Sequence, residues 1–301
     1  MRPRIQGAED HGRADEAVRP QRSPQAGTVA LPGVTGHRVR GAADAARYAT
    51  LARVATDTAI AVGEAIVQTD VRIVTRKKGR ANFATAADHA AERAIIARLA
   101  AHDPEIPVLA EESPKAALRK AERLWVVDPI DGTLNFSRAI PFYCVVIAYV
   151  EGGRTRAAAV HAPRTGETFT ASEGRGATRN GLTISVGSVT KLTEAFAVAS
   201  IAFGATKRKD SRFVALNSTC ARLRVLGSAA LEICYVAMGT FDLFAHEALS
   251  PWDIAAPALI AREAGASVLS LKTGDDAAWD ERQVVIANPK LAREAMKLLR
   301  R

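Results

Sequence analysis

Apolar positions recur every three or four residues in several parts of the chain, and such spacing predicts amphipathic helices. Elsewhere, short apolar runs lie between turn residues, which is typical of β-strands. On this basis helices are predicted at 41–67, 88–101, 213–221, 229–238, 254–264 and 291–299. Strands are predicted at 108–110, 124–127, 143–150, 157–161, 167–170, 183–186, 196–199, 242–245, 267–271 and 284–286, and residues 72–80 are expected to form a loop.

The predicted helices and strands alternate irregularly, and Gly152-Gly153 favours a hairpin between two of the strands. This order indicates an α+β fold with mixed sheets rather than a doubly wound parallel sheet. We expect an N-terminal α+β subdomain at 41–187 and a C-terminal α/β subdomain at 188–301. Residues 1–40 lack apolar periodicity, and their arginines outnumber their acidic residues, so a disordered basic extension is predicted there.

The residues most typical of a functional site follow the apolar run 124–127. It delivers Asp128 and Asp131 to a predicted turn, and Gly132 and Thr133 open the next element. Carboxylate oxygens beside free backbone N–H groups suit Mg²⁺ and a phosphate group together. A turn that uses Asp, Pro and Gly only for its conformation is the alternative interpretation.

Further acidic residues lie where a metal site could use them. Asp88 is predicted near the start of a helix, Glu111 ends a short apolar strand, and Asp253 precedes an apolar helix. Each of these alone is also typical of a solvated strand end or a helix cap. The metal interpretation therefore depends on their occurring together.

Together, the motifs resemble the inositol monophosphatase family over about residues 41–301. The resemblance rests on Asp88, on Glu111-Glu112-Ser113, on the run 128–133 and on the run 252–256, in that order. It implies a lithium-sensitive, Mg²⁺-dependent phosphomonoesterase that forms homodimers. It also implies a layered α-β-α-β-α sandwich with the active site between the two subdomains.

The resemblance further implies a role for each site residue. Asp128 would bridge two Mg²⁺ ions, Glu111 and the carbonyl of Ile130 would complete the first site, and a third, weaker ion would lie near Glu111. The remaining metal ligands would be Asp131 and Asp253; Thr133, Asp88 and Glu111 would act in catalysis, and the N–H groups of Gly132 and Thr133 would hold phosphate. Substrate contacts are expected from Gly227, Ser228, Ala229, His246 and Glu247.

Two positions depart from the family pattern. Asn82 stands where the family usually has an acid, which weakens the case for a third ion. His246 stands where a substrate-binding Glu often lies, seven residues before Asp253, and Glu247 is one residue closer. The resemblance implies inositol 1-phosphate as the first expected substrate, and because the departure at His246 counts against inositol specificity, histidinol phosphate, fructose 1,6-bisphosphate, adenosine 3′,5′-bisphosphate and NADP stay as alternatives.

Composition narrows the class of protein. The chain is 48% hydrophobic and 24% charged, as in globular proteins, and it has no apolar stretch long enough for a bilayer, so no membrane partner is expected. Three cysteines without metal-ligand spacing favour free thiols and a cytoplasmic location.

The net charge of +9 suits a small phosphorylated substrate, but it also suits RNA. An RNA or transcription-complex binding protein is therefore the alternative of another class. Aromatic residues make up only 5% of the chain, and no RNA-binding signature is present, so nucleic acid is not the expected partner.

Overall fold

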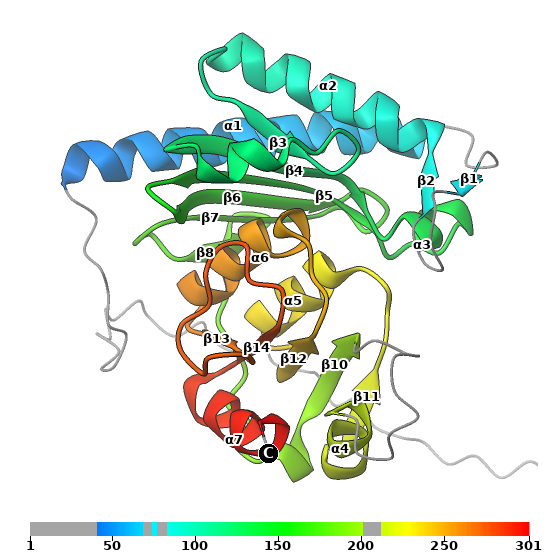
Figure 1. Cartoon of the computed structure of the whole chain (residues 1–301), viewed down its shortest axis with the longest axis vertical. Coiled ribbons are helices and arrows are strands. Elements are labelled where there is room, and N and C mark those ends of the chain that lie inside the picture. Colours follow the sequence, from blue (N-terminus) through cyan, green and yellow to red (C-terminus); the bar gives the residue numbers. More distant parts are fainter. Residues whose placement is uncertain (1–40, 69–73, 77–82, 201–211, 301) are drawn as a thin grey trace, which may run out of the picture. The chain divides into compact units, whose positions relative to one another are not determined.

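Two mixed β-sheets and the helices packed on them form the part of the chain that the computed structural model describes, residues 41–68, 74–76, 83–200 and 212–300 (Figure 1). Residues 36–301 group into one unit, and the predicted extension 1–40 and Asn82 lie outside the described residues. The predicted division of the body at residue 187 stays a prediction.

The larger sheet follows the order of the chain. Its described strands are β3 (Val108–Ala110), β4 (Arg123–Asp131), β5 (Cys144–Glu151), β6 (Arg154–Ala162), β7 (Glu167–Ser172), β8 (Ala177–Arg179) and β9 (Leu182–Thr183). Only the pair β3 and β4 is parallel among these strands. Apolar side chains fill both faces of the central strands, so both faces need a helical cover.

The smaller sheet has the order β11-β10-β12-β14-β13. Its strands are β10 (Phe196–Ser200), β11 (Arg222–Arg224), β12 (Leu243–His246), β13 (Ser267–Ser270) and β14 (Val284–Ala287). Strand β10 runs parallel to both of its neighbours, and β14 runs antiparallel to both of its own. The sheet is therefore mixed, as the sequence predicted.

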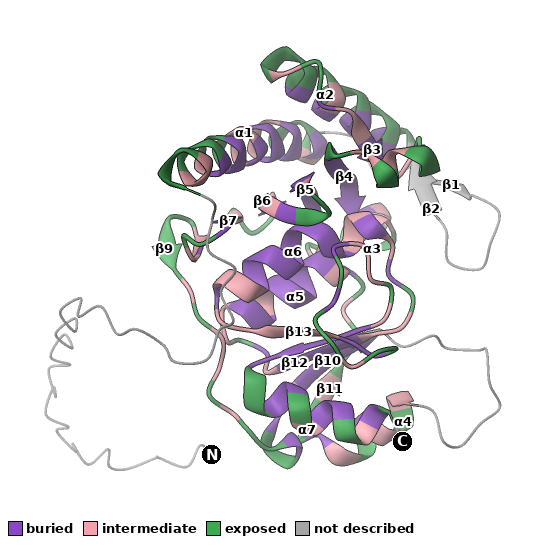
Figure 2. Ribbon diagram, turned by 60° about the vertical axis from the view of Figure 1, so that its left-hand side comes forward, coloured by how far each residue is buried: buried purple, intermediate pink, exposed green. Residues whose placement is uncertain are grey.

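Helices separate and cover the two sheets. The described helices are α1 (Ala42–Val67), α2 (Ala86–His102), α3 (Thr133–Ser137), α4 (Arg212–Thr219), α5 (Ala229–Ala237), α6 (Pro251–Glu263) and α7 (Pro289–Leu299). Helices α1 and α2 cover one face of the larger sheet, α5 and α6 lie between the sheets, and α4 and α7 cover the smaller sheet (Figures 1 and 2). The predicted α-β-α-β-α layering is confirmed.

Helix α1 lies unusually close to the larger sheet. Its buried face consists largely of small residues, and a Cβ atom added at Gly63 would lie only 2.5 Å from Cδ2 of His161 on β6. His161 is itself buried and bonds Thr168 on β7 through its Nδ1 atom at 2.9 Å. The small residues of α1 thus let the helix pack against a polar pair on the sheet.

Several predicted elements are wrong in detail. The predicted loop at 72–80 contains β1 (Val74–Arg76), which pairs with β2 (Phe83–Thr85). The predicted strand at 183–186 ends at Thr183, because the chain turns from β9 toward the smaller sheet, where the Val186 N–H donates to the Ala264 carbonyl. Strands β8 and β11 are too short to show a clear period and were not predicted.

Strand β4 is longer than predicted, and this difference shapes the site. The strand continues past residue 127 to Asp131, with a register shift in which Asp128 faces Val146 and Asp131 faces Cys144 on β5. In a regular strand, residues three apart point to opposite faces. The extra residue of this bulge returns Asp131 to the face of Asp128 and sends Ile130 to the opposite core with Val127.

Two expectations from composition can be compared with the structure. No helix among the described residues is long and apolar enough to cross a membrane. Cys144, Cys220 and Cys234 are all buried free thiols. Burial raises the pKa of each thiol, which makes the thiolate form scarce.

Candidate active site

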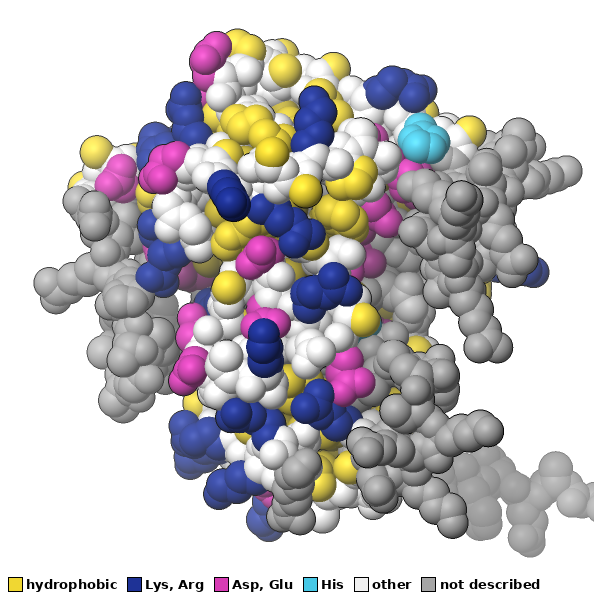
Figure 3. All heavy atoms as spheres, in the orientation of Figure 1, with side chains coloured by type: hydrophobic (Ala, Val, Ile, Leu, Met, Phe, Trp, Pro, Cys, Tyr) yellow, Lys and Arg dark blue, Asp and Glu magenta, His cyan; other side chains and the backbone are white. Residues whose placement is uncertain are grey.

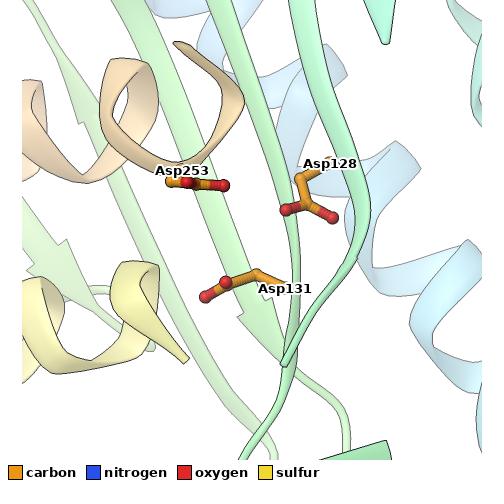
Figure 4. A group of neighbouring side chains, drawn as sticks. All are labelled: Asp128, Asp131 and Asp253. Carbon is orange, nitrogen blue, oxygen red and sulfur yellow. The ribbon is translucent and has the colours of Figure 1, made fainter. Parts of the chain in front are cut away.

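Three aspartates from distant parts of the chain turn their carboxylates toward a common space (Figure 4). Asp128 and Asp131 come from β4, and Asp253 comes from the first turn of α6. One carboxylate oxygen of each lies within 4.8 Å of the corresponding oxygens of the other two. Oxygen ligands at this spacing suit a hard divalent cation such as Mg²⁺.

The aspartates open onto a cavity of about 350 Å³. It is lined by the end of β4, the start of α3 and the N-terminus of α6, together with Glu111 and Gly227. No Lys, Arg or His is among the described residues that line it, whereas Glu111 adds a further carboxylate. The described lining of the cavity therefore concentrates negative charge, and the nearby charge of Arg282 offsets part of it at Asp253.

Each aspartate uses one oxygen to bind the backbone. An oxygen of Asp128 accepts from the Ile130 N–H at 2.9 Å, and an oxygen of Asp253 accepts from the Ser250 N–H at 2.7 Å within the capping box of α6. Oδ2 of Asp131 accepts from the Ala230 N–H at 2.8 Å. These bonds fix the three side chains, and the carboxyl groups of Asp128 and Glu111 also hydrogen-bond each other.

The carboxylates of the cavity repel one another, and a bound cation would offset this repulsion. Burial raises the pKa of Asp128 well above its usual range, and the neighbouring Glu111, Asp131 and Asp253 raise it further. Burial and the charge of Glu112 likewise raise the pKa of Glu111 to about 7. Like charges this close are stabilised in the ionised form when a divalent metal lies between them. The donor set thus fits the Mg²⁺ that the sequence predicted.

A threonine hydroxyl and a buried aspartate lie beside the carboxylates. Oγ1 of Thr133 is 3.1 Å from Oδ1 of Asp88 and 3.0 Å from the carbonyl oxygen of Ile130. Asp88 is buried in the first turn of α2. This pair, which the sequence predicted from separate motifs, is able to orient a water molecule and to accept a proton from it.

The turn before Thr133 requires glycine. Gly132 has a φ of 92°, and a Cβ atom added to it would lie 3.0 Å from the carbonyl oxygen of Phe142. A side chain at this position would therefore be strained and crowded against the backbone. Gly132 lines the cavity together with Thr133, as a predicted phosphate-binding residue should.

The predicted substrate contacts lie in different surroundings. Gly227 lines the cavity, whereas Ser228 is fully buried and donates its hydroxyl to Asp131, and the Ala229 N–H also faces that carboxylate. His246 and Glu247 are not among the described residues that line the cavity. The roles of these residues in substrate binding stay predictions.

Glu247 already has a strong partner. Its carboxylate accepts a hydrogen bond from Arg212 at 2.7 Å, and Arg212 also donates to the carbonyl of Leu299. His246 accepts the Ala248 N–H on Nδ1 at 3.0 Å, so the neutral ring carries its proton on Nε2. Of the two residues, His246 therefore keeps a free donor for a hydroxyl group.

Two buried glutamates hold the loops around the site, and sequence reasoning missed both roles. Glu92 on α2 accepts the Glu112 N–H at 2.7 Å and the Ser113 hydroxyl at 2.5 Å. Glu232 on α5 accepts the N–H groups of Leu226 and Gly227 at 2.7 and 3.2 Å. The only available signal was a charged residue amid apolar neighbours, as Glu232 is between Leu231 and Ile233.

His246 is expected to make the protein sensitive to acid. Burial lowers its pKa from 6.5 to about 4, so above pH 6.5 the ring is neutral in the folded and unfolded chains alike. As the pH falls from 6.5 toward 4, only the unfolded chain gains the proton, and folding loses up to about 3 kcal/mol. Urea unfolding of His246→Gln should show a smaller loss over this window.

The matched control for this prediction is His102→Gln, which removes an exposed histidine at the end of α2. It should leave the acid sensitivity of the wild type unchanged. A His246→Gln protein that loses as much stability as the wild type between pH 6.5 and 4 would contradict the assignment of this effect to His246.

Comparison with known proteins agrees with this geometry. A model of the inositol monophosphatase family matches residues 46–301. The protein named Nus factor SuhB from Vibrio cholerae is 38% identical over 208 residues, which cover 68% of this chain and 78% of that protein. The protein named fructose-1,6-bisphosphatase/inositol-1-monophosphatase from Thermotoga maritima is 34% identical over 226 residues, which cover 75% of this chain and 86% of that protein.

A solved structure shares the fold. The crystal structure of the extragenic suppressor protein suhB from Bartonella henselae superposes with a TM-score of 0.77 at 28% sequence identity. The superposition covers 84% of this chain and 99% of that one. Both the layered sheets and the sequence motifs around the acidic cavity are thus typical of one family.

Proposed function

This chain belongs to the inositol monophosphatase family and is a phosphatase, and we propose that it hydrolyses small phosphate monoesters with Mg²⁺, inositol 1-phosphate being the first expected substrate. The observation that carries the proposal is the cavity in which the clustered carboxylates adjoin the pair Thr133 and Asp88. A binding module without catalysis would not need an oriented hydroxyl and a buried base beside a cation site.

The residues of the cavity divide the work of an in-line displacement. Asp128, Asp131, Asp253, Glu111 and the Ile130 carbonyl would hold Mg²⁺, which would supply Lewis-acid stabilisation of charge on the attacking and leaving oxygens. The Thr133 hydroxyl donates to Asp88, so its oxygen is free to accept a hydrogen bond from the attacking water. Asp88 takes up the proton, and the N–H groups of Gly132 and Thr133 bind the phosphate oxygens.

The identity of the alcohol that leaves is a separate proposal. Because Glu247 is paired with Arg212, we assign the contact with substrate hydroxyls to the Nε2–H of His246. A neutral donor suits a polyol or sugar hydroxyl, and inositol 1-phosphate and fructose 1,6-bisphosphate both offer one. This contact bears on the choice of substrate, and the substrate panel described next tests it.

The test is phosphate release from a panel of monoesters. The panel holds inositol 1-phosphate, fructose 1,6-bisphosphate, histidinol phosphate, adenosine 3′,5′-bisphosphate and NADP, each with Mg²⁺, with Mg²⁺ plus Li⁺, and with a chelator. We expect release that needs Mg²⁺, falls with Li⁺ and is fastest with inositol 1-phosphate. Asp128→Asn protein prepared in parallel excludes a contaminating phosphatase. Absence of release from every member at saturating Mg²⁺ would overturn the proposal.

A second candidate function is binding to RNA or a transcription complex. It is supported by the relative named Nus factor SuhB and by the net charge of +9. On the face shown in Figure 3, however, the Lys and Arg side chains of the described residues are interspersed with Asp and Glu. Salt-sensitive retention of the full-length chain on RNA, without phosphate release from the panel, would favour this candidate over catalysis.

Three finer expectations accompany the main proposal. Inhibition by lithium and a homodimer follow from the family resemblance, a cytoplasmic location follows from the cysteine usage, and all three stay predictions. The panel assay tests the first of them, and sedimentation of the full-length chain tests the second. A monomer at micromolar concentration would contradict the dimer without affecting the proposed chemistry.

A further inference from the structure

We propose that Ser228, together with Cys144, positions the metal ligand Asp131 rather than contacting the substrate. The inference rests on the proposed Mg²⁺ site, because it assigns a task to residues behind that site. Oδ2 of Asp131 accepts the Ser228 hydroxyl at 2.5 Å and the Ala230 N–H at 2.8 Å, and the Cys144 thiol lies 3.8 Å from the same oxygen.

These donors are sealed from solvent. Ser228 and Cys144 are both fully inaccessible, and the sulfur of Cys144 lies 3.7 Å from the Ser228 hydroxyl oxygen. A serine hydroxyl has a single proton to donate, and here it points to a carboxylate that accepts only. Ser228 therefore has no donor left for a substrate hydroxyl.

Ser228 and the backbone donors lie at the start of α5, and this position suits a negatively charged partner. Ser228 is the N-cap of α5, and the N–H groups at the start of this nine-residue helix, which have no partner within the helix, favour a negative charge. Asp131 is buried, which disfavours its ionised form, and these hydrogen bonds act in the opposite direction by lowering its pKa. They hold the Asp131 carboxylate in one place, where one of its oxygens lies within 4.8 Å of an oxygen of Asp128 and of Asp253.

The link also joins two parts of the site. Asp131 ends a strand of the larger sheet, and α5 lies between the two sheets, so one hydrogen-bonded oxygen connects the end of β4 to the start of α5. Glu232 on the same helix holds the N–H groups of Leu226 and Gly227. The start of α5 thus sets both a metal ligand and the cavity wall at Gly227.

Partners behind a metal ligand typically change metal affinity by about 10- to 100-fold when removed. We therefore expect Ser228→Ala to bind Mg²⁺ about 10- to 100-fold more weakly, with a smaller change in kcat once Mg²⁺ saturates the site. A role in packing alone predicts a lower Tm with an unchanged Mg²⁺ affinity. Metal affinity, measured directly, therefore separates positioning from packing.

The experiment titrates Mg²⁺ alone into the full-length protein by calorimetry, with kcat measured in parallel. Ser218→Ala on α4 is the matched control, because it removes an exposed hydroxyl that bonds only its own helix. Weaker Mg²⁺ binding by Ser228→Ala and wild-type binding by the control are expected. Equal affinities in Ser228→Ala and the wild type would overturn the inference, whereas a wild type that binds no Mg²⁺ would overturn the proposed function instead.

A second variant keeps the test decisive if Ser228→Ala fails to fold. Ser228→Cys retains a weaker donor of similar shape, and its Mg²⁺ affinity should lie between those of the wild type and a protein without the donor. Cys144→Ala removes the other side-chain donor and should weaken Mg²⁺ binding less, since its contact with Asp131 is longer. Wild-type affinity in both variants would contradict the positioning role.

Discussion

Replacing Asp128 with asparagine is expected to lower kcat/KM for Mg²⁺-dependent phosphate release by about 10³-fold or more. Lewis-acid stabilisation by a bound metal is worth several kcal/mol, and each 1.36 kcal/mol corresponds to a factor of about ten in rate. We expect a large share of this effect from Asp128, since its carboxylate interacts with the charges of Glu111, Asp131 and Asp253. Initial rates over a range of Mg²⁺ concentrations measure the loss.

The same change should leave the fold intact. The neighbouring carboxylates already raise the pKa of Asp128, so a neutral amide removes repulsion from the metal-free protein. We expect a Tm without metal at least as high as that of the wild type, and a smaller rise on adding Mg²⁺. Asp275→Asn is the matched control, because Asp275 is exposed and remote from the cavity. A near-wild-type kcat in Asp128→Asn at saturating Mg²⁺ would refute the two-metal assignment.

Replacing Thr133 with alanine is expected to lower kcat by about 10²-fold, a smaller but still severe loss. The hydroxyl is the group that joins Asp88 to the cavity, at 3.1 Å from Oδ1 of that aspartate. Without it, a water molecule loses the acceptor that orients it, and Asp88 loses its link to the reaction. The carboxylates of the metal site are untouched, so the Mg²⁺ dependence of the remaining activity should change little.

Two variants sharpen the test of Thr133. Thr133→Ser keeps the hydroxyl and should recover most of the rate. Ser137→Ala, on the same short helix, removes an exposed hydroxyl that bonds only the Leu134 carbonyl, and it should behave as the wild type. If Thr133→Ala keeps its full kcat, Thr133 has no part in activating water, and the base must be sought elsewhere.

The sequence was sufficient to single out the acidic residues of the cavity but not the way in which they are brought together. Asp128 and Asp131 are three residues apart, and a regular strand would place them on opposite faces. Only the register shift on β4, set by pairing with β5, returns both to one face. Sheet pairing is non-local, so no local pattern of residues could show this bulge before the structure did.

The position of Asp253, in contrast to the bulge on β4, was partly predictable from the local sequence. Its place at the start of an apolar helix was predictable from local sequence, and the structure adds the capping box with Ser250. That this helix lies between the two sheets and delivers Asp253 to the end of β4 depends on tertiary packing. The layering was expected from the family resemblance rather than from the alternation of helices and strands.

The buried partners of the site were the least predictable part. Ser228 and Ala230 contact Asp131 across 97 and 99 residues of sequence, and no spacing rule covers such a distance. Glu92 and Glu232 looked like ordinary helix residues, yet both bind backbone N–H groups beside the cavity. Second-layer contacts of this kind follow from the packing of whole elements.

The central claim is that the acidic cavity is a metal centre, and anomalous diffraction from crystals soaked in Mn²⁺ tests it most directly. Mn²⁺ accepts the oxygen ligands of Mg²⁺ and scatters strongly enough to be located. We predict one peak against Asp128 and Glu111 and a second against Asp128, Asp131 and Asp253. A map at saturating Mn²⁺ with no peak among these carboxylates would contradict the account.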